Sequence, residues 1–301
     1  MSVAGLKYYL SSPANMFDFF ASRNMLNWMS DEAFLKRKFK LRMGYKLNLK
    51  NPKTFNEKLQ WLKLYDRNPL YTKLVDKYEV RKYIAKKIGE EYLIPLVGGP
   101  WNSPDEIDFA ALPDQFVLKC THDSGGVIIC KDKSVLDIPA AKAKLNKRLK
   151  CSYYWKNREW PYKDVPPRII AEKYMEDETG ELRDFKVFCF NGMPRMMYIS
   201  RDAAADTTTD FFDTDFNHLP IRMKDPNSAI LPPKPECFEE MQRIASVLSE
   251  GIPHVRTDFY CANSKIYFGE LTFFHNGGFT GIKPAEWNYK VGGWIKLPGK
   301  E

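Results

Sequence analysis

The stretch that decides the fold is His254–Phe273, HVRTDFYCANSKIYFGELTF, near the end of the chain. Its alternating pattern predicts two antiparallel strands, 254–261 and 266–273, joined by a short turn. Alternation puts one set of side chains on a single face of each strand: Arg256, Asp258 and Tyr260 on the first, and Phe268, Glu270 and Thr272 on the second. An odd-length or bulged turn would place Asp258 and Glu270 opposite each other.

These two carboxylates need a partner, because burying an unpaired charge on an otherwise apolar strand is costly. Oxygen ligands of this kind, together with nucleotide phosphates, are what Mg²⁺ prefers, so Asp258 and Glu270 are candidate magnesium ligands. The alternative is that both are surface residues, each paired with a nearby Arg or Lys. The apolar neighbours favour the metal site.

Upstream of this hairpin, short apolar runs bounded by turn residues predict further strands, and longer periodic runs predict helices. The strands expected are 116–120, 127–130, 168–175 and 185–190, with an extended segment at 92–97 leading into a loop. The helices expected are 54–62, where Thr54 and Glu57 resemble a capping box, 74–88, 139–150 and 236–250. Hairpin sheets with segregated helices make an α+β protein.

The composition supports a sizeable core: of 301 residues, 44% are hydrophobic, including 20 Phe, 16 Tyr and 7 Trp, which excludes a disordered chain. No run of about 18 apolar residues occurs, and the first twenty residues hold no sustained apolar stretch, so we expect neither a membrane-spanning helix nor a secretory signal. The six cysteines are widely spaced without a CxxC pair. We therefore expect no disulfides, no structural zinc and a reducing cytoplasm.

Positive charge is concentrated at the start of the chain. The net charge is +8, and residues 1–50 hold nine Lys or Arg against three Asp or Glu, most densely at Lys36–Arg42. A basic helix interleaved with Phe and Leu suits an anionic membrane surface or an acidic polymer, here through residues 36–46. A solvated helix face is the alternative. Nucleic acid ranks last, because no nucleic-acid-binding motif occurs.

Lys119 is a second candidate, at the end of the predicted strand 116–120 and just before Ser124-Gly125-Gly126. Glycines let backbone N–H groups approach phosphate oxygens and a Lys neutralises their charge, which suits a polyphosphate. On this segment alone an ordinary glycine-turn hairpin is the preferred interpretation. Neither a Walker A sequence nor GxGxxG occurs, which excludes P-loop and Rossmann sites.

Three further features each have two interpretations. Asp184 and Lys186 share a strand face, either as an internal ion pair or with the Lys binding a phosphate or carboxylate. The aromatic connection 153–162 is either a lid that stacks on a sugar or core packing. His122 and His275 are weak candidates for bases, since a lone loop His is more often a hydrogen-bonding residue.

Taken in order, several segments resemble the TupA-like ATP-grasp family, which is encoded with bacterial surface-polysaccharide genes. The resemblance runs from about Phe55 to Leu297, and each piece is weak alone. The segments are FNEKLQWLKLYDRNPLYTKLVDKYEVRKYI, FVLKCTHDSGG, RIIAEKYMED, RDFKVFCFNG, RTDFYCANSKIYFGELTFF and a closing GG-x-I-x-L-P-like tail. The resemblance implies an ATP-grasp fold, in which two α+β subdomains sandwich ATP. We expect a helical, basic segment at 1–110, a lid subdomain at 111–176 and a C-terminal subdomain with the magnesium site at 177–301.

Site residues carry over from the family pattern position by position. For phosphate these are Lys119, Ser124, Gly125 and Gly126; for adenine and ribose Glu172, Lys173, Tyr174 and Met175; for catalysis Lys186, Arg201 and Arg256; and for magnesium Asp258 and Glu270. The chain departs from the pattern where Thr272 replaces a usual Asn, so the third magnesium ligand is either Thr272 or Asn276. A second departure is the helical N-terminal segment, which replaces most of the usual substrate domain.

The resemblance implies an ATP- and Mg²⁺-dependent carboxylate–amine ligase that forms an amide through an acyl-phosphate. For a surface-polysaccharide enzyme, the carboxylate would be a uronic acid and the amine an amino acid or small amino alcohol. We expect a cytoplasmic enzyme, with peripheral contact at the inner membrane face as a further option. A sugar or polyol kinase on the same fold, a glycosyltransferase and a non-catalytic scaffold for an anionic polymer remain alternatives.

Overall fold

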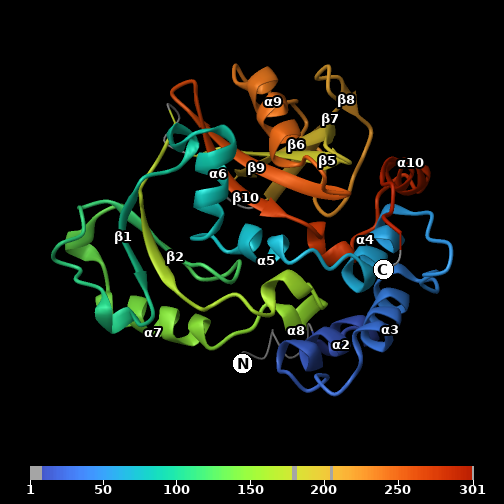
Figure 1. The fold of residues 1–301 in the computed structure, drawn as a ribbon, viewed down its shortest axis with the longest axis horizontal. Coiled ribbons are helices and arrows are strands. Elements are labelled where there is room, and N and C mark those ends of the chain that lie inside the picture. Colours follow the sequence, from blue (N-terminus) through green and yellow to red (C-terminus); the bar gives the residue numbers. More distant parts are fainter. Residues whose placement is uncertain (1–8, 178–181, 204–205, 300–301) are drawn as a thin grey trace.

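The computed structural model describes residues 9–177, 182–203 and 206–299, and organises them around two antiparallel sheets (Figure 1). The smaller sheet has the strand order β1-β4-β2-β3, and the larger has the order β10-β9-β5-β6-β7-β8. The strands are β1 (Leu96–Trp101), β2 (Phe116–Cys120), β3 (Val127–Cys130), β4 (Ile169–Lys173), β5 (Asp184–Phe190), β6 (Met193–Ala203), β7 (Asp206–Phe212), β8 (His218–Leu219), β9 (His254–Ala262) and β10 (Lys265–Thr272).

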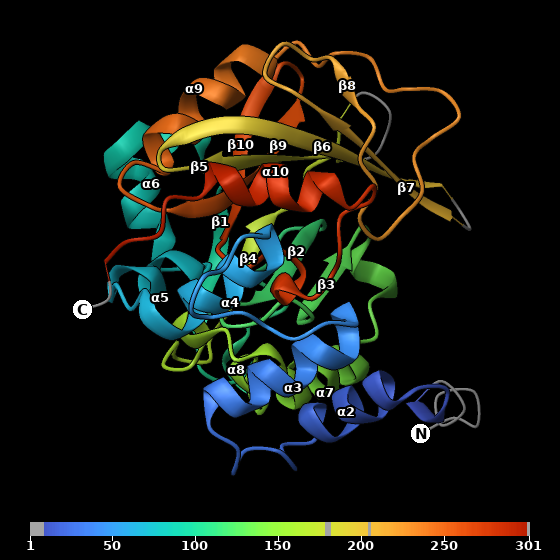
Figure 2. The same cartoon turned by 90° about the vertical axis from the view of Figure 1, so that its right-hand side faces the viewer.

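Helices surround both sheets, which confirms the expected α+β class; α9 packs against β5, β6 and β9 on one face of the larger sheet (Figure 2). The α-helices are α2 (Pro13–Ser22), α3 (Asp31–Met43), α4 (Phe55–Tyr65), α5 (Leu70–Val75), α6 (Val80–Ile88), α7 (Ile138–Leu149), α8 (Tyr154–Asn157), α9 (Phe238–Leu248) and α10 (Glu286–Trp294). The short 3-10 helices are η1 (Glu90–Tyr92), η2 (Pro104–Glu106), η3 (Lys133–Val135), η4 (Trp160–Tyr162) and η5 (His275–Gly278).

Most elements predicted from local patterns are confirmed. The capping box forms: the Thr54 side chain accepts from the Glu57 backbone N–H, and the Glu57 carboxylate accepts from the Thr54 backbone N–H. The helix predicted over 74–88 is wrong, because the chain breaks between α5 and α6. In the break, the buried Asp76 carboxylate accepts from the Tyr78 N–H at 2.8 Å and from Arg168 at 2.7 Å. A side chain bonded to its own backbone competes with the helix ladder.

β1 is also placed differently from the expected extended segment at 92–97. The strand begins at Leu96 and continues through Gly98, Gly99 and Pro100, which the sequence assigned to a loop. β4 provides a partner for this segment, although the pairing is irregular on both sides of Gly98. A strand from the expected segment 1–110 therefore joins the smaller sheet. The three domain boundaries stay a prediction, and residues 1–8 of the first segment lie outside the described part of the chain.

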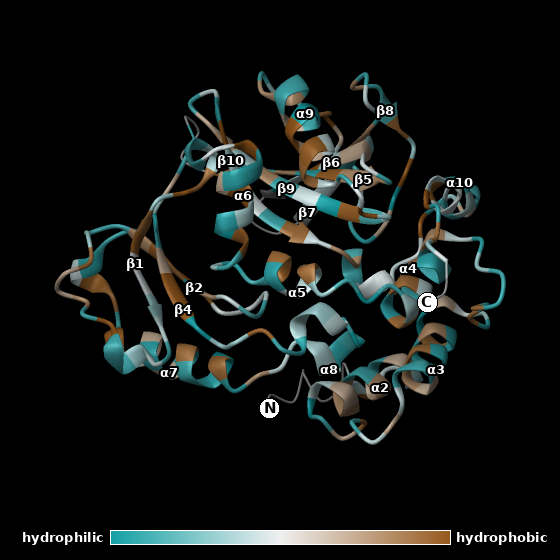
Figure 3. Ribbon diagram, in the orientation of Figure 1, coloured by the Kyte–Doolittle hydropathy of each residue, from teal (hydrophilic) through white to brown (hydrophobic). Residues whose placement is uncertain are grey.

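Two hydrophobic cores stabilise the molecule. The larger one joins the N-terminal helices to the larger sheet, and the smaller one lies between β2, β4 and α7, with Phe116, Leu118 and Leu145 fully buried. Hydrophobic residues along β2 and β4 are visible in brown in Figure 3. Each sheet therefore has its own buried face, as expected for two packed layers.

The basic helix α3 is only partly a solvated face. Phe34, Leu35 and Phe39 are buried, and so is Lys38, whose side chain is turned inward to Asp18 at 2.7 Å. The contact of residues 36–46 with an anionic surface stays a prediction. Of the helices in the described ranges, none combines the length and apolar character needed to cross a membrane.

The C-terminal hairpin forms as predicted, with a two-residue turn at Asn263-Ser264 in the left-handed region. An irregularity between Phe268 and Glu270 makes Gly269 an extra residue in β10, so Asp258 pairs with Glu270. The predicted face of Phe268 is wrong for the same reason. Phe268 pairs with Phe259, on the opposite face from Glu270, because an inserted residue reverses the alternation.

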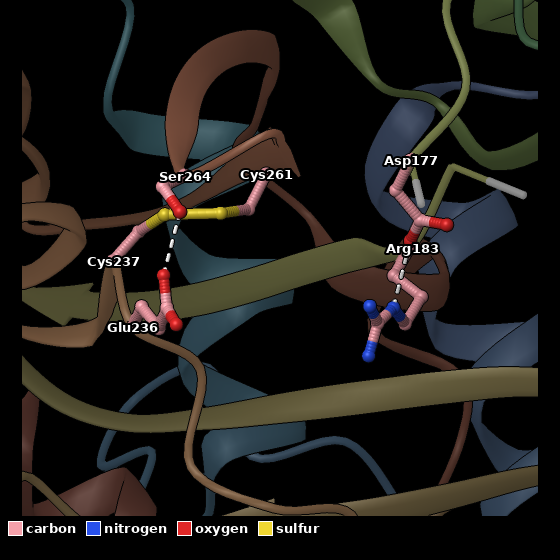
Figure 4. Close-up of a disulfide and its surroundings, with 6 residues drawn as sticks. All are labelled: Asp177, Arg183, Glu236, Cys237, Cys261 and Ser264. Atoms are coloured by element: carbon pink, nitrogen blue, oxygen red, sulfur yellow. Dashed lines mark hydrogen bonds and ion pairs between the residues drawn. A yellow bond between two sulfur atoms is a disulfide. The ribbon is translucent and has the colours of Figure 1, made fainter. Parts of the chain in front are cut away.

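A disulfide joins Cys237 to Cys261, with Cα atoms 6.8 Å apart (Figure 4), so the expectation of no disulfides is wrong. The bond links the end of β9 to the residue just before α9. Beside the disulfide, the Ser264 hydroxyl donates a hydrogen bond to Glu236 Oε2 at 2.6 Å. The same view shows the Arg183 guanidinium donating to Asp177 before β5. Fold topology, rather than sequence spacing, brings these cysteines together, and the cytoplasmic location stays a prediction.

Candidate active site

A pocket of about 400 Å³ lies between the two sheets. Its walls come from β2, β3 and the end of β4 on one side and from Tyr260 of β9 on the other. Its lining includes five residues expected at a nucleotide site: Lys119, Glu172, Lys173, Tyr174 and Met175. Apolar side chains, among them Val117, Val127 and Ile129, supply flat walls, and the volume is within the range of small-molecule sites.

Lys119 and Glu172 form an ion pair inside this pocket, with Nζ 2.5 Å from Oε2. They come from neighbouring strands, since β2 and β4 pair with Val117 opposite Glu172. Arg81 of α6 lies 3.5 Å from the other carboxylate oxygen. Glu172 therefore balances two cations, and a phosphate that entered the pocket would find both of them already in place.

The loop Thr121–Gly126 is held by its own Asp123, which is buried. Asp123 Oδ1 accepts from the backbone N–H groups of Gly125 at 2.6 Å and Gly126 at 2.8 Å, and Arg148 donates to Oδ2 at 2.7 Å. A Cβ on Gly126 would lie 2.5 Å from Cys120 Sγ, so only glycine fits there. Ser124 and Gly125 line a neighbouring cavity of about 530 Å³ rather than the Lys119 pocket.

Across the pocket, Arg256 connects the two carboxylates of the hairpin. Its Nε and Nη2 donate to Asp258 at 2.6 and 2.5 Å, and Nη2 also reaches Glu270 Oε1 at 3.2 Å and Thr272 Oγ1 at 3.1 Å. Burial alone would raise the pKa of Glu270, but Lys77 and Arg256 outweigh it and hold that pKa below its usual range. Glu270, whose side chain is 37% exposed, is therefore an anion.

These carboxylates fit magnesium in part. Asp258 and Glu270 are adjacent and ionisable, and Thr272 offers a hydroxyl 3.0 Å from Glu270 Oε1. Within the described ranges, no cluster of three or more His, Cys, Asp or Glu side chains is arranged to hold a metal ion. Asp258 and Glu270 would therefore hold Mg²⁺ only together with phosphate oxygens and water, which is how this ion is usually bound.

The remaining predicted residues divide into two groups. Lys186 of β5 lies directly opposite Asp258 and is ion-paired with Asp184, so it borders the carboxylate cluster. Arg201 does not join this cluster. Along β6, Arg201 lies on the same face as Ile199, which pairs with Phe185 on the other side of the sheet. The Arg201 guanidinium donates to the Ile230 carbonyl at 3.3 Å. Strand alternation thus turns Arg201 away from the carboxylate cluster, and its catalytic role stays a prediction.

The sequence did not reveal Lys77, Arg81 or the role of His275. Lys77 occupies the break between α5 and α6 and donates to the Asp123 carbonyl at 2.6 Å, which connects it to the glycine loop. The continuous helix predicted over 74–88 gave no indication of this contact. His275 Nδ1 lies 2.7 Å from Arg256 Nη1, and burial together with Arg256 holds the pKa of His275 well below its usual value. The imidazole is therefore neutral. His122 lies outside this cluster, with Nε2 3.2 Å from the Arg148 carbonyl oxygen.

Solved structures of several ligases align with parts of this chain at low sequence identity. A D-alanine–D-alanine ligase from Bacillus anthracis aligns at 17% identity and a TM-score of 0.39 over 66% of this chain and 57% of that one. The D-alanine–D-alanine ligase from Helicobacter pylori aligns at 12% identity and a TM-score of 0.42, over 80% of this chain and 69% of that one. The ATP-grasp ligase PsnB, solved with minimal precursor, Mg and ADP, aligns at 11% identity and a TM-score of 0.37, over 72% of this chain and 57% of that one. This chain thus spans little more than half the length of two of these proteins.

No curated protein matches the chain. The sequence model of one family, described as TupA-like ATPgrasp, matches residues 57–296, which include both sheets and the pocket between them. The matched range holds Lys119, Glu172, Asp258 and Glu270. The chain belongs to the TupA-like ATP-grasp family and has the ATP-grasp fold.

Proposed function

We propose that this protein is an ATP-dependent ligase that joins a carboxylate to an amine. The carboxylate we propose is a uronic acid, and the amine an amino acid or small amine, in the synthesis of bacterial surface polysaccharide. The observation that carries the proposal is the position of the Lys119 pocket: Tyr260, two residues from Asp258, forms its far wall. A nucleotide between the sheets would extend its phosphates toward the carboxylate cluster.

The pocket residues suit a nucleotide. The apolar walls at Val117 and Ile129 fit a purine ring, and the backbone of Lys173–Met175 offers groups at its edge. Lys119 and Arg81 are already held near each other by Glu172 and would neutralise phosphate oxygens. Asp123 fixes the glycine loop that follows β2.

The chemistry then needs charge neutralisation and positioning more than covalent help from the protein. A carboxylate oxygen attacks the γ-phosphorus of ATP, the bond to the β-phosphate oxygen breaks, and ADP leaves. The amine attacks the resulting acyl carbon, phosphate leaves with its bonding electrons, and one amine proton is released to solvent. Arg256 and Lys186 stabilise the developing negative charge. Magnesium held by Asp258 and Glu270 would act as a Lewis acid on the phosphates.

The test is to incubate the protein with Mg-ATP and every pairing of a uronic-acid panel with an amine panel, reading ADP release and product mass. Amide formation that requires both substrates supports the proposal. ADP release with the sugar alone, with phosphate added to a hydroxyl, would assign a kinase instead. If no pairing released ADP, the proposal would be wrong. Asp258→Asn, assayed at limiting magnesium, is the low-activity control, and Glu250→Gln, at an exposed carboxylate paired with Lys87, is the matched active one.

A further inference from the structure

A further cavity of about 410 Å³ lies against the N-terminal helices and shares no lining residue with the nucleotide pocket. Its lining comes from α2, α3, α8, the loop around Lys224 and η5. The charged and amide residues that line it are Asp18, Lys38, Arg42, Lys156, Asn157, Lys224 and Asn276. The helical segment that is unusual for the fold thus forms one side of a cavity.

The cavity is strongly cationic, with four basic side chains against one carboxylate. That carboxylate, Asp18, is engaged by both Lys38, at 2.7 Å, and Arg42. Lys156 is exposed, and the Lys224 side chain is 72% exposed, with Asp225 only 3.5 Å away as its acidic neighbour. A solvent-filled cavity with this excess of positive charge attracts a ligand with more than one negative charge.

Two buried lysines, Lys38 and Lys63, hold the inner wall together. Lys38 Nζ donates to the Lys156 carbonyl at 3.0 Å and to Asn157 Oδ1 at 2.7 Å. Lys63 Nζ donates to the carbonyls of Asn157 at 2.9 Å and Gly277 at 2.6 Å. The segments carrying Lys156 and Asn276 are therefore fixed to each other, so the cavity does not depend on mobile surface lysines alone.

His275 connects this wall to the candidate active site. Its Nδ1 must accept from Arg256 Nη1, because a guanidinium can only donate, so Nε2 carries the proton. Asn276 Nδ2 is placed 3.1 Å from Nε2, which would bring two donors together, so the amide has to be turned to present its oxygen there. Its two N–H donors are then left for the cavity, one residue away from a side chain that contacts Arg256.

We propose that this cavity binds the carboxylate-bearing substrate, and that this substrate is a sugar acid with at least one further anionic group. The inference rests on the proposed function. The reacting carboxylate lies at the Asn276 side, nearest Arg256, and the second anionic group lies at Lys156 and Lys224. That group is either a phosphate, as in a sugar-acid phosphate, or another carboxylate, as in a short polyuronate.

The test measures binding by calorimetry without ATP, so that turnover does not enter. The probes are glucuronic acid, glucuronic acid 1-phosphate and trigalacturonic acid. We expect one of the two multiply charged probes to bind about tenfold or more tighter than glucuronic acid. The variant Lys156→Gln/Lys224→Gln should remove that advantage, while Lys265→Gln/Lys290→Gln, with the same charge change at exposed sites, should keep it. Whichever probe gains affinity identifies the source of the second charge.

Equal affinities for the three probes, no binding of any, or an unchanged advantage in Lys156→Gln/Lys224→Gln would each overturn the inference. So would loss of the advantage in Lys119→Ala, since that result would place the phosphate in the nucleotide pocket. The two proposals fail separately. ADP release and amide formation without charge-selective binding would support the ligase activity and overturn the assignment of the cavity. Charge-selective binding without any turnover would support the cavity assignment and overturn the ligase activity.

Discussion

Asp258 and Glu270 face each other across β9 and β10 because Gly269 is inserted as one extra residue in β10. If β10 paired regularly after Phe268, Gly269 would lie opposite Asp258, and Glu270 would lie opposite Thr257 on the apolar side of the sheet. A single glycine thus allows one strand to supply both a core phenylalanine and a candidate metal ligand. A Cβ at this position would lie 3.0 Å from the Asp258 carbonyl oxygen, which is tight.

Asp258→Asn and Glu270→Gln should each raise the magnesium concentration needed for half-maximal rate, because each removes one anionic oxygen ligand. The measurement is ADP release against magnesium concentration. A general base would behave differently: its loss would lower the rate at an unchanged magnesium requirement and flatten the acid limb of the pH profile. Glu250→Gln, which alters an exposed carboxylate, should match the unmodified protein.

Lys119→Met should lower kcat/KM for ATP by about a hundredfold, since it removes a cation from the proposed phosphate site. The fold should persist, because Glu172 keeps Arg81 at 3.5 Å as a partner. The measurement is steady-state ADP release, with thermal unfolding to check the fold. Lys290→Met, at an exposed helix position, is the control. Near-normal turnover in Lys119→Met would remove Lys119 from the phosphate site.

The two tryptophans of the aromatic connection should respond differently. Trp160 is buried, with its ring 5.9 Å from that of Tyr71, so Trp160→Ala should lower the free energy of unfolding by about 3–5 kcal/mol. Trp155 is half-buried and lines the cavity beside Ser124, so Trp155→Ala should raise the KM of the acceptor. Chemical denaturation and acceptor titrations measure the two effects. An unchanged acceptor KM in Trp155→Ala would exclude a lid role.

His254 should make the protein sensitive to acid. Burial lowers the pKa of His254 to about 3, whereas the unfolded chain protonates near pH 6.5. Between those values the unfolded state binds more protons, so stability falls as the pH drops, by up to about 1.4 kcal/mol per pH unit. His254→Phe, compared with the unmodified protein by urea unfolding at pH 6, 5 and 4, should show a shallower loss. Parallel slopes would contradict the assignment.

The sequence predicted the elements whose signals are local. β2 and β3, the β9–β10 hairpin and the capped start of α4 all follow from alternation, turn residues or the Thr54–Glu57 box, which act over a few positions. The pairing of Asp258 with Glu270 was predicted conditionally, because a bulge can be suspected at a glycine but not located from alternation alone. α10 and the strands β6 to β8 were not predicted.

Other features were decided only by the tertiary structure. Asp76 ends α5 because Arg168, 92 positions along the chain, meets its carboxylate. Gly98 to Pro100 become a strand because β4 pairs with them, and Cys237 meets Cys261 because β9 ends beside α9. The sequence by itself determined which residues carry the candidate chemistry, since charge and alternation are properties of neighbouring positions. The tertiary structure decided which of them meet, with Lys186 beside Asp258 and Arg201 on the opposite face, because strand register and packing join positions that no local pattern connects.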